Sequence, residues 1–76
     1  MRELLEIIAR ALVDNPEEVW VNEVEGEKSI ILELKVSKDD MGKVIGKQGR
    51  IAKAIRTVIK AAAVKENKRI VVEIIQ

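Results

Sequence analysis

The stretch that decides the fold is MGKVIGKQGR, residues 41–50, in which three glycines and three basic residues fall within ten positions. Glycine lets a backbone turn tightly and lets another chain approach closely. Exposed N–H groups and cations both attract phosphate. The stretch therefore predicts a turn that binds a phosphate group of a nucleotide, of a nucleic-acid backbone or of a lipid.

The spacing of the glycines argues against the two common nucleotide-binding loops. A P-loop has the pattern GxxxxGK[ST] directly after a strand. Here only three residues separate Gly42 from Gly46, and Gln48 stands where a Ser or Thr would hold magnesium. The GxG of the dinucleotide-binding fingerprint is also missing from the sequence. The remaining pattern is a GxxG turn, Gly46 to Gly49, between two helices.

Helical patterns flank this turn on both sides. Ser37 is expected to cap a short helix, with Asp40 three residues later as in a capping box. Gly46 is expected to end this helix in a left-handed conformation. Gly49 opens a longer helix, whose apolar residues recur at helical spacing as far as Ala62 and which Asn67-Lys68 is expected to break. The free N–H groups at the start of the longer helix should therefore lie beside the turn.

The remaining segments predict one more helix and three strands. Apolar periodicity indicates an amphipathic helix over residues 2–14, which Asn15-Pro16 ends. Alternating patterns predict a hairpin of strands at 19–24 and 30–36, and a last strand at 70–75. The order α-β-β-α-α-β predicts an α+β fold, with a three-stranded sheet packed against three helices.

Composition and charge narrow the class of function. The sequence forms one domain, residues 1–76, with 47% hydrophobic and 36% charged residues and neither cysteine nor histidine. Residues 1–40 carry a net charge of −6 and residues 41–69 a net charge of +8, which is typical of one basic surface for a polyanion. No apolar run approaches the ~20 residues that span a bilayer. We expect no enzyme, no cofactor and no metal site, and Asp39 and Asp40 are interpreted as first-turn acids favoured by the helix dipole.

The segment VIGKQGR, residues 44–50, resembles the I-G-x-x-G signature of KH domains, whose GxxG loop clamps about four nucleotides of backbone. The element order resembles the type II KH topology, and the resemblance covers nearly the whole chain. The chain is most similar to small bacterial single-domain proteins, the KH-domain protein A (KhpA) family. The resemblance implies a cytoplasmic RNA-binding protein, an RNA chaperone or post-transcriptional regulator. It also implies action with a second KH protein, KhpB, and a link to cell elongation and peptidoglycan homeostasis.

The candidate site combines a phosphate clamp, a basic helix face and an aliphatic groove for bases. The clamp is assigned to Lys43, Gly46, Lys47, Gln48, Gly49 and Arg50, the basic face to Lys53, Arg56 and Lys60, and the groove to Val44, Ile45 and Ile51.

Each of these features also has a plainer interpretation. The basic face can be an ordinary solvated surface, and the aliphatic residues can be mostly core. Trp20, the only aromatic residue, is favoured as a core or dimer contact over base stacking. A second class of function is a protein-docking subunit with a degenerate nucleic-acid site. Binding to an anionic membrane is a third and weaker alternative for the function.

Self-association is expected in so short a chain. Ala61, Ala63 and Val64 lie beside or opposite the core stripe of the long helix, and Ile31 and Val71 lie on the nominally polar faces of their strands. A C2 pairing that buries the small-residue flank of the long helix would use this surface. The expected partners are single-stranded RNA and a second copy of the chain, a KhpB-like protein or both, with no membrane.

Overall fold

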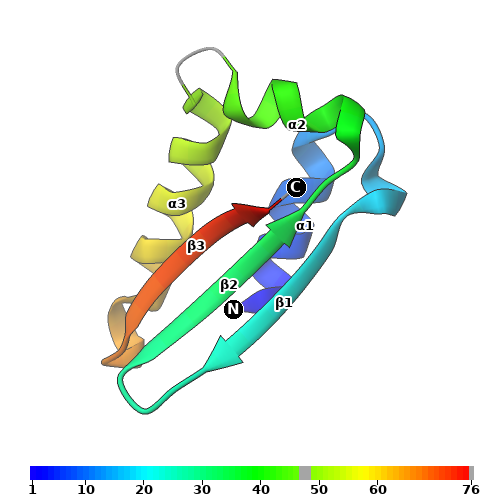
Figure 1. Ribbon diagram of the computed structural model, residues 1–76. Helices are drawn as coiled ribbons and strands as arrows, with labels where there is room; N and C mark the ends of the chain where they lie inside the picture. The colour runs from blue at the N-terminus through cyan, green and yellow to red at the C-terminus, as the bar shows by residue number, and fades with distance from the viewer. Residues whose placement is uncertain (47–48, 76) are drawn as a thin grey trace.

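Three strands form one sheet, and helices cover one of its two faces (Figure 1). The computed structural model describes residues 1–46 and 49–75. The elements are α1 (Arg2–Leu12), the 3-10 turn η1 (Pro16–Glu18), β1 (Trp20–Glu25), β2 (Ser29–Lys35), α2 (Lys38–Ile45), α3 (Arg50–Ala62), the 3-10 turn η3 (Ala63–Glu66) and β3 (Arg69–Ile75). This order confirms the α+β class and the sequence α-β-β-α-α-β.

The central strand of the sheet is β2, with β1 and β3 at the two edges. β1 pairs with β2 in antiparallel register, with Trp20 opposite Lys35. β3 pairs with β2 in parallel register, with Ile30 beside Ile70. Parallel neighbours need a long crossover connection, and α2 and α3 supply it here. The end of α2 and the start of α3 therefore lie at the end of the sheet where β2 finishes (Figure 1).

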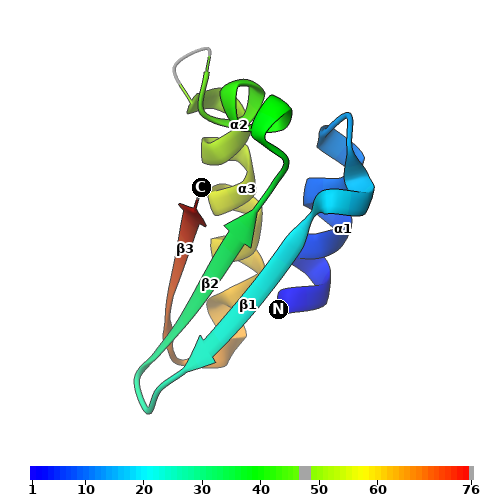
Figure 2. The ribbon, with the colours of Figure 1, turned by 45° about the vertical axis from the view of Figure 1, so that its right-hand side comes forward.

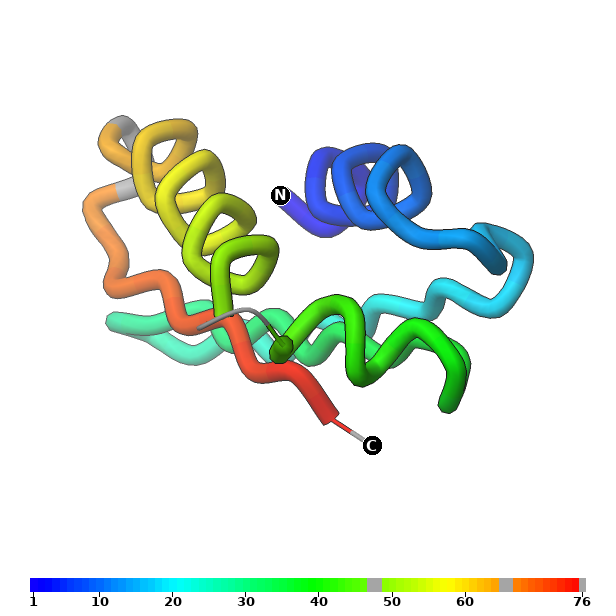
Figure 3. Tube along the Cα trace, turned by 90° about the horizontal axis from the view of Figure 1, so that it is seen from above, coloured from blue at the N-terminus to red at the C-terminus, as the bar shows by residue number. Residues whose placement is uncertain are grey.

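The core lies between the sheet and the helix layer. α1 and α3 lie over the same face of the sheet, and α2 lies at its end (Figures 2 and 3). Leu32 and Leu34 of the central strand are fully buried, together with Leu5 of α1 and Ile59 of α3. Burial of one such side chain contributes about 1.5–3 kcal/mol. The alternate residues of each strand point to the opposite face, which no helix covers.

A buried carboxylate ties α2 to the segment that follows α1. Ser37 caps α2, with its Oγ accepting from the Asp40 N–H at 3.1 Å. The Asp40 side chain, 1% exposed, accepts from the backbone N–H groups of Asp14 and Asn15, each at 2.9 Å. It also accepts from the Asn15 amide at 3.1 Å and the Ser37 hydroxyl at 2.9 Å.

The Ser37 cap is thus confirmed, and Asp40 lies in the first turn of α2 as expected, but its expected capping-box role is wrong. A capping-box acid accepts from the backbone N–H of the capping residue. Asp40 instead reaches donors 25 and 26 residues earlier in the chain. The two ends of this contact come together only through tertiary packing, so the local pattern did not reveal it.

These contacts set the ionisation of Asp40. Burial opposes the charged form and by itself raises the pKa of Asp40, but the hydrogen bonds from Asp14, Ser37 and Asn15 outweigh it and lower the pKa below its usual value. Hydrogen bonds to a carboxylate favour the ionised form in this way. Asp40 is therefore a charged group that the native fold stabilises.

We predict that Asp40→Asn lowers the melting temperature by several degrees, because an amide presents an N–H group where the native donors need an acceptor. The folded-state pKa lies below the unfolded value of about 4. The stabilisation is therefore complete above about pH 4 and is lost as the pH falls through the folded-state pKa. Thermal melts followed by circular dichroism between about pH 7 and about pH 2 measure both effects.

The matched control is Asp39→Asn, since Asp39 is an exposed acid in the same helical turn. It should change the melting temperature little at any pH. Equal losses in the two variants would show that first-turn charge, and not the buried contacts, stabilises this end of α2.

Candidate functional site

Two glycines with different constraints shape the turn between α2 and α3. Gly46 ends α2 in an extended conformation, with φ −76° and ψ 178°, and its N–H donates to the Gly42 carbonyl at 2.8 Å. A Cβ on Gly46 would collide with that same carbonyl oxygen. Gly49 has φ 69° and ψ 29°, in the left-handed region, and its N–H donates to the Gly46 carbonyl at 2.9 Å.

The left-handed conformation expected at Gly46 is therefore wrong. The chain reverses three residues later, at Gly49, and a close approach of backbone to backbone requires the glycine at position 46. Lys47 and Gln48, the two central residues of the expected clamp, lie outside the described residues.

The first turn of α3 is electropositive. Gly49 provides no side chain to cap the helix, and the first turn contains no acidic residue. Arg50 and Lys53 are both exposed there. The free N–H groups and the positive end of the helix dipole add to these two charges. The turn and the start of α3 together can hold an anion such as a phosphate.

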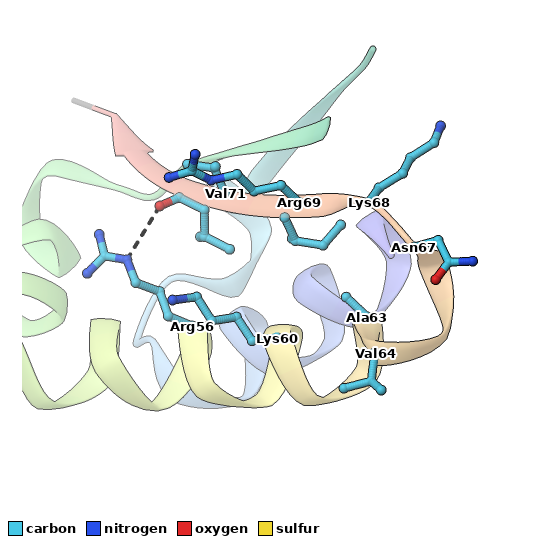
Figure 4. A pocket seen from close by; sticks show the side chains of 10 residues that line it. Arg56, Lys60, Ala63, Val64, Asn67, Lys68, Arg69 and Val71 are labelled. Atoms are coloured by element: carbon cyan, nitrogen blue, oxygen red, sulfur yellow. Dashed lines mark hydrogen bonds between the residues drawn. The ribbon is translucent and has the colours of Figure 1, made fainter. Parts of the chain in front are cut away.

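The basic face continues along α3 at helical spacing. Lys53, Arg56 and Lys60 are exposed and follow one another at intervals of three or four residues. The Arg56 Nε donates to the Val72 carbonyl at 3.4 Å (Figure 4). Because Val72 belongs to the edge strand β3, this contact holds the guanidinium between α3 and the sheet.

A hollow of about 570 Å³ lies between the second half of α3 and the first half of β3 (Figure 4). Arg56 and Lys60 rise from α3 toward β3, and Arg69 lies along the opposite wall. The hollow is lined by Arg56, Lys60, Ala63, Val64, Asn67, Lys68, Arg69, Ile70, Val71 and Val72. It therefore combines aliphatic walls with a cationic rim.

Arg69 and Lys68 line the hollow but were not predicted as site residues from the sequence. Both contributed to the excess charge of residues 41–69, but only the packing of β3 against α3 brings Arg69 next to Arg56 and Lys60. Lys68 differs from Arg69, because its Nζ lies 2.6 Å from Glu25 Oε2 at the end of β1. The hydrogen bond and charge of Lys68 lower the pKa of Glu25. The charge of Lys68 is thus shared with a partner inside the chain.

The remaining site residues divide by burial. Val44 is fully buried in the core, so it supports the turn from behind. Ile45 is 50% exposed and Ile51 is half-buried, so both present surface beside the turn. Lys43 is exposed on α2, with its Nζ 3.3 Å from Asp14 Oδ1. The aliphatic surface next to the turn is therefore made by Ile45 and Ile51.

The surface expected for self-association is only partly available. Ala63 is 6% exposed and belongs to the core, so its description as a surplus residue is wrong. Ala61 of α3 and Val64 of η3 are exposed. Trp20 is 50% exposed, so of its two expected roles, core residue or dimer contact, the core role is wrong.

The described part of the chain contains neither a metal cluster nor a membrane-spanning helix. Among the side chains of residues 1–46, 49–64 and 67–75 there is no cluster of three or more Asp, Glu, His or Cys groups arranged for a metal ion. No helix in those ranges has the length and apolar character needed to cross a membrane.

The unit β2–α2–turn–α3–β3, with a GxxG turn and with α1 and β1 before it, defines a KH-like domain in the type II order. The family model described as "KhpA/KhpB, KH domain" matches residues 2–74, and the chain belongs to this family. No solved structure gave a significant match.

Three relatives show how far the similarity extends, and each is named RNA-binding protein KhpA. The protein of Clostridium perfringens is 80% identical over 99% of this chain and 100% of its own length. The protein of Caldanaerobacter subterraneus is 69% identical over 99% of this chain and 100% of its own length. The protein of Aquifex aeolicus is 49% identical over 100% of this chain and 96% of its own length.

The two glycines of the turn should respond differently to substitution. Gly49→Ala should cost about 1 kcal/mol of unfolding free energy, because a left-handed conformation disfavours a Cβ while the space around it is open. Gly49→Asn should cost less, since Asn adopts this conformation more readily. Gly46→Ala should cost more than either, because the last turn of α2 must move. Urea unfolding ranks the three variants, and a Gly46→Ala protein as stable as the parent would refute the steric role of Gly46.

Proposed function

We propose that this domain binds single-stranded RNA along a path from the glycine turn, down α3, to the hollow against β3. One observation carries the proposal: exposed cations follow the uncapped start of α3 at helical spacing and lead to a cationic hollow at the edge of the sheet. From Arg50 to Lys60 the helix rises about 15 Å. A path of this length fits the few nucleotides that a KH domain contacts.

The chemistry of the path assigns different roles to its parts. Backbone N–H groups and cations at the turn hold phosphates, which position a strand without reading its sequence. The clamp includes Lys47 and Gln48 together with Arg50. The aliphatic surface of Ile45 and Ile51 would receive unstacked bases, which only a single strand offers. Broad sequence tolerance follows, because the contacts to phosphate outnumber those that distinguish bases.

The relatives named RNA-binding protein KhpA support RNA as the ligand. On this basis the domain is a binding module and not an enzyme, and it acts in the cytoplasm as an RNA chaperone or post-transcriptional regulator. Association with a second copy or with a KhpB-like KH protein would raise affinity through effective concentration. The family resemblance connects this role to cell elongation and peptidoglycan homeostasis.

We predict that Arg50→Gln, Lys53→Gln and Arg56→Gln together weaken binding of a single-stranded RNA oligonucleotide about tenfold or more at low salt. For each cation that no longer neutralises a phosphate, the slope of log K against log salt should fall by about 0.7. Fluorescence anisotropy at several salt concentrations measures both quantities.

A control with the same change in charge is available elsewhere in the chain. Arg2, Arg10 and Lys28 are exposed and lie on α1 and in the hairpin turn. Their replacement by Gln should leave the salt slope nearly unchanged. Equal weakening in the two triple variants would show that net charge, and not this path, determines binding. Full-strength binding by the α3 variant would favour the docking-subunit alternative.

A substitution at Gly42 tests independently whether the RNA strand passes close to α2. Gly42 lies in the interior of the helix, and no atom lies within 4 Å of the position that a Cβ would take. Gly42→Ala should therefore stabilise the fold by about 0.5–1 kcal/mol. If RNA passes close to this helix, the same change should weaken RNA binding. Gly26→Ala in the distant hairpin turn controls for the added methyl group, and unchanged RNA affinity in Gly42→Ala would place the strand away from α2.

A further inference from the structure

The sheet face that no helix covers has its own pattern of side chains. Ile30, Leu32 and Leu34 of β2 are buried beneath the helix layer, so their alternate neighbours point to the open side. The strand registers place most of these side chains in three rows, and Ser29 beside Arg69 begins a fourth row at the hairpin end. The first row is Trp20, Lys35 and Ile75, the middle row is Asn22, Glu33 and Glu73, and the last row is Val24, Ile31 and Val71.

The two outer rows are largely apolar. Trp20 and Val24 are 50% and 49% exposed, and Ile31, Val71 and Ile75 are half-buried. The open face of such a sheet usually carries polar side chains. Tryptophan with aliphatic neighbours is instead typical of the buried centre of a protein interface.

The middle row is acidic. Glu33 and Glu73 occupy adjacent positions on neighbouring strands, which lie about 4.8 Å apart. Like charges in such positions disfavour the fold. Asn22 Nδ2 donates to Glu33 Oε1 at 2.9 Å, and the ion pairs among the described residues include neither carboxylate. Lys35, in the first row, is exposed and pairs with neither of them in the described part of the chain. The chemical complement of this row is therefore a cation supplied from outside.

We propose that the open sheet face docks a partner protein through a helix that presents a Lys or Arg between two apolar side chains. Successive rows lie two residues apart along each strand, a step of about 6.7 Å. Residues i and i+4 of a helix are about 6 Å apart along its axis. A helix with the pattern apolar–xxx–basic–xxx–apolar would thus place its three side chains over the three rows. A helix laid on this face would complete a second layer over the sheet.

The charges on this face argue against the other two occupants. Phosphates of RNA are repelled by Glu33 and Glu73 in the middle row, and Arg69, the one cation of the RNA path on this side of β3, lies two rows away from them. The other cations of that path lie on α3. A second copy paired by a C2 axis through the middle row would bring carboxylates against carboxylates. A basic segment of a different protein meets neither objection.

The experiment uses Trp20, whose emission reports on this face because it is the only tryptophan in the chain. A displayed library of helical peptides, with positions i, i+4 and i+8 varied among Leu, Lys, Glu and Ser, is selected on the whole protein. We expect winners with Leu, Lys and Leu at these positions, and a shift of Trp20 emission when they bind. Glu33→Gln with Glu73→Gln should weaken binding about tenfold, equivalent to about 1.4 kcal/mol.

Two further variants make the result specific. Glu17→Gln with Glu18→Gln changes the net charge equally in the exposed turn η1 and should leave peptide affinity unchanged. Val24→Ser removes an apolar contact while keeping the Trp20 signal, and should weaken binding. The triple variant of α3 should bind peptide normally, so loss of RNA binding and loss of docking can be told apart.

Several outcomes would overturn the proposal. They are a selection that returns no binder, winners without a basic residue at i+4, or undiminished binding by the Glu33/Glu73 variant. A shift of Trp20 emission with protein concentration alone, accompanied by a doubled mass, would assign the face to a second copy. A shift caused by RNA would assign it to nucleic acid.

Discussion

The parallel pairing of β2 with β3 is the constraint on which the rest of the structure depends. Two parallel neighbours cannot be joined by a hairpin, so the chain must travel from one end of the sheet to the other before β3 begins. α2 and α3 form this crossover connection, and the chain must change direction between them beyond the end of β2. The glycine turn, the exposed start of α3 and the basic face beside β3 all follow from this one pairing.

The same arrangement separates charge between two sides of a small molecule. Cations follow α3 and the outer edge of β3, whereas Glu33 and Glu73 lie on the uncovered sheet face. A polyanion is attracted to the first side and repelled by the second. The net charge of +1 conceals this division, since it averages a basic surface with an acidic one.

The sequence predicted the secondary-structure elements, which depend on local pattern, and missed the contacts that depend on tertiary packing. Helical and alternating periodicities located the three strands and the starts of the three α-helices to within two residues, because neighbouring side chains alone decide them. The long helix was expected to continue to Asn67-Lys68, but α3 ends at Ala62 and the 3-10 turn η3 follows it. The extended conformation of Gly46 depends on its approach to a carbonyl of α2, and a glycine in a sequence does not show which constraint it serves. The bonds of Asp40 to Asp14 and Asn15, and the place of Arg69 beside Arg56, join residues far apart in the chain, so no local signal indicates them.

The position of β3 has a consequence for how the domain is made. The hairpin of β1 and β2 uses contacts between near neighbours, whereas the first pair of β2 and β3, Ser29 and Arg69, must close a long loop. During translation the hairpin and both crossover helices leave the ribosome before β3 does. β3, the strand that carries Arg69 and accepts the hydrogen bond of Arg56, is therefore added last. A nascent chain has no complete hollow between α3 and β3 until β3 has emerged.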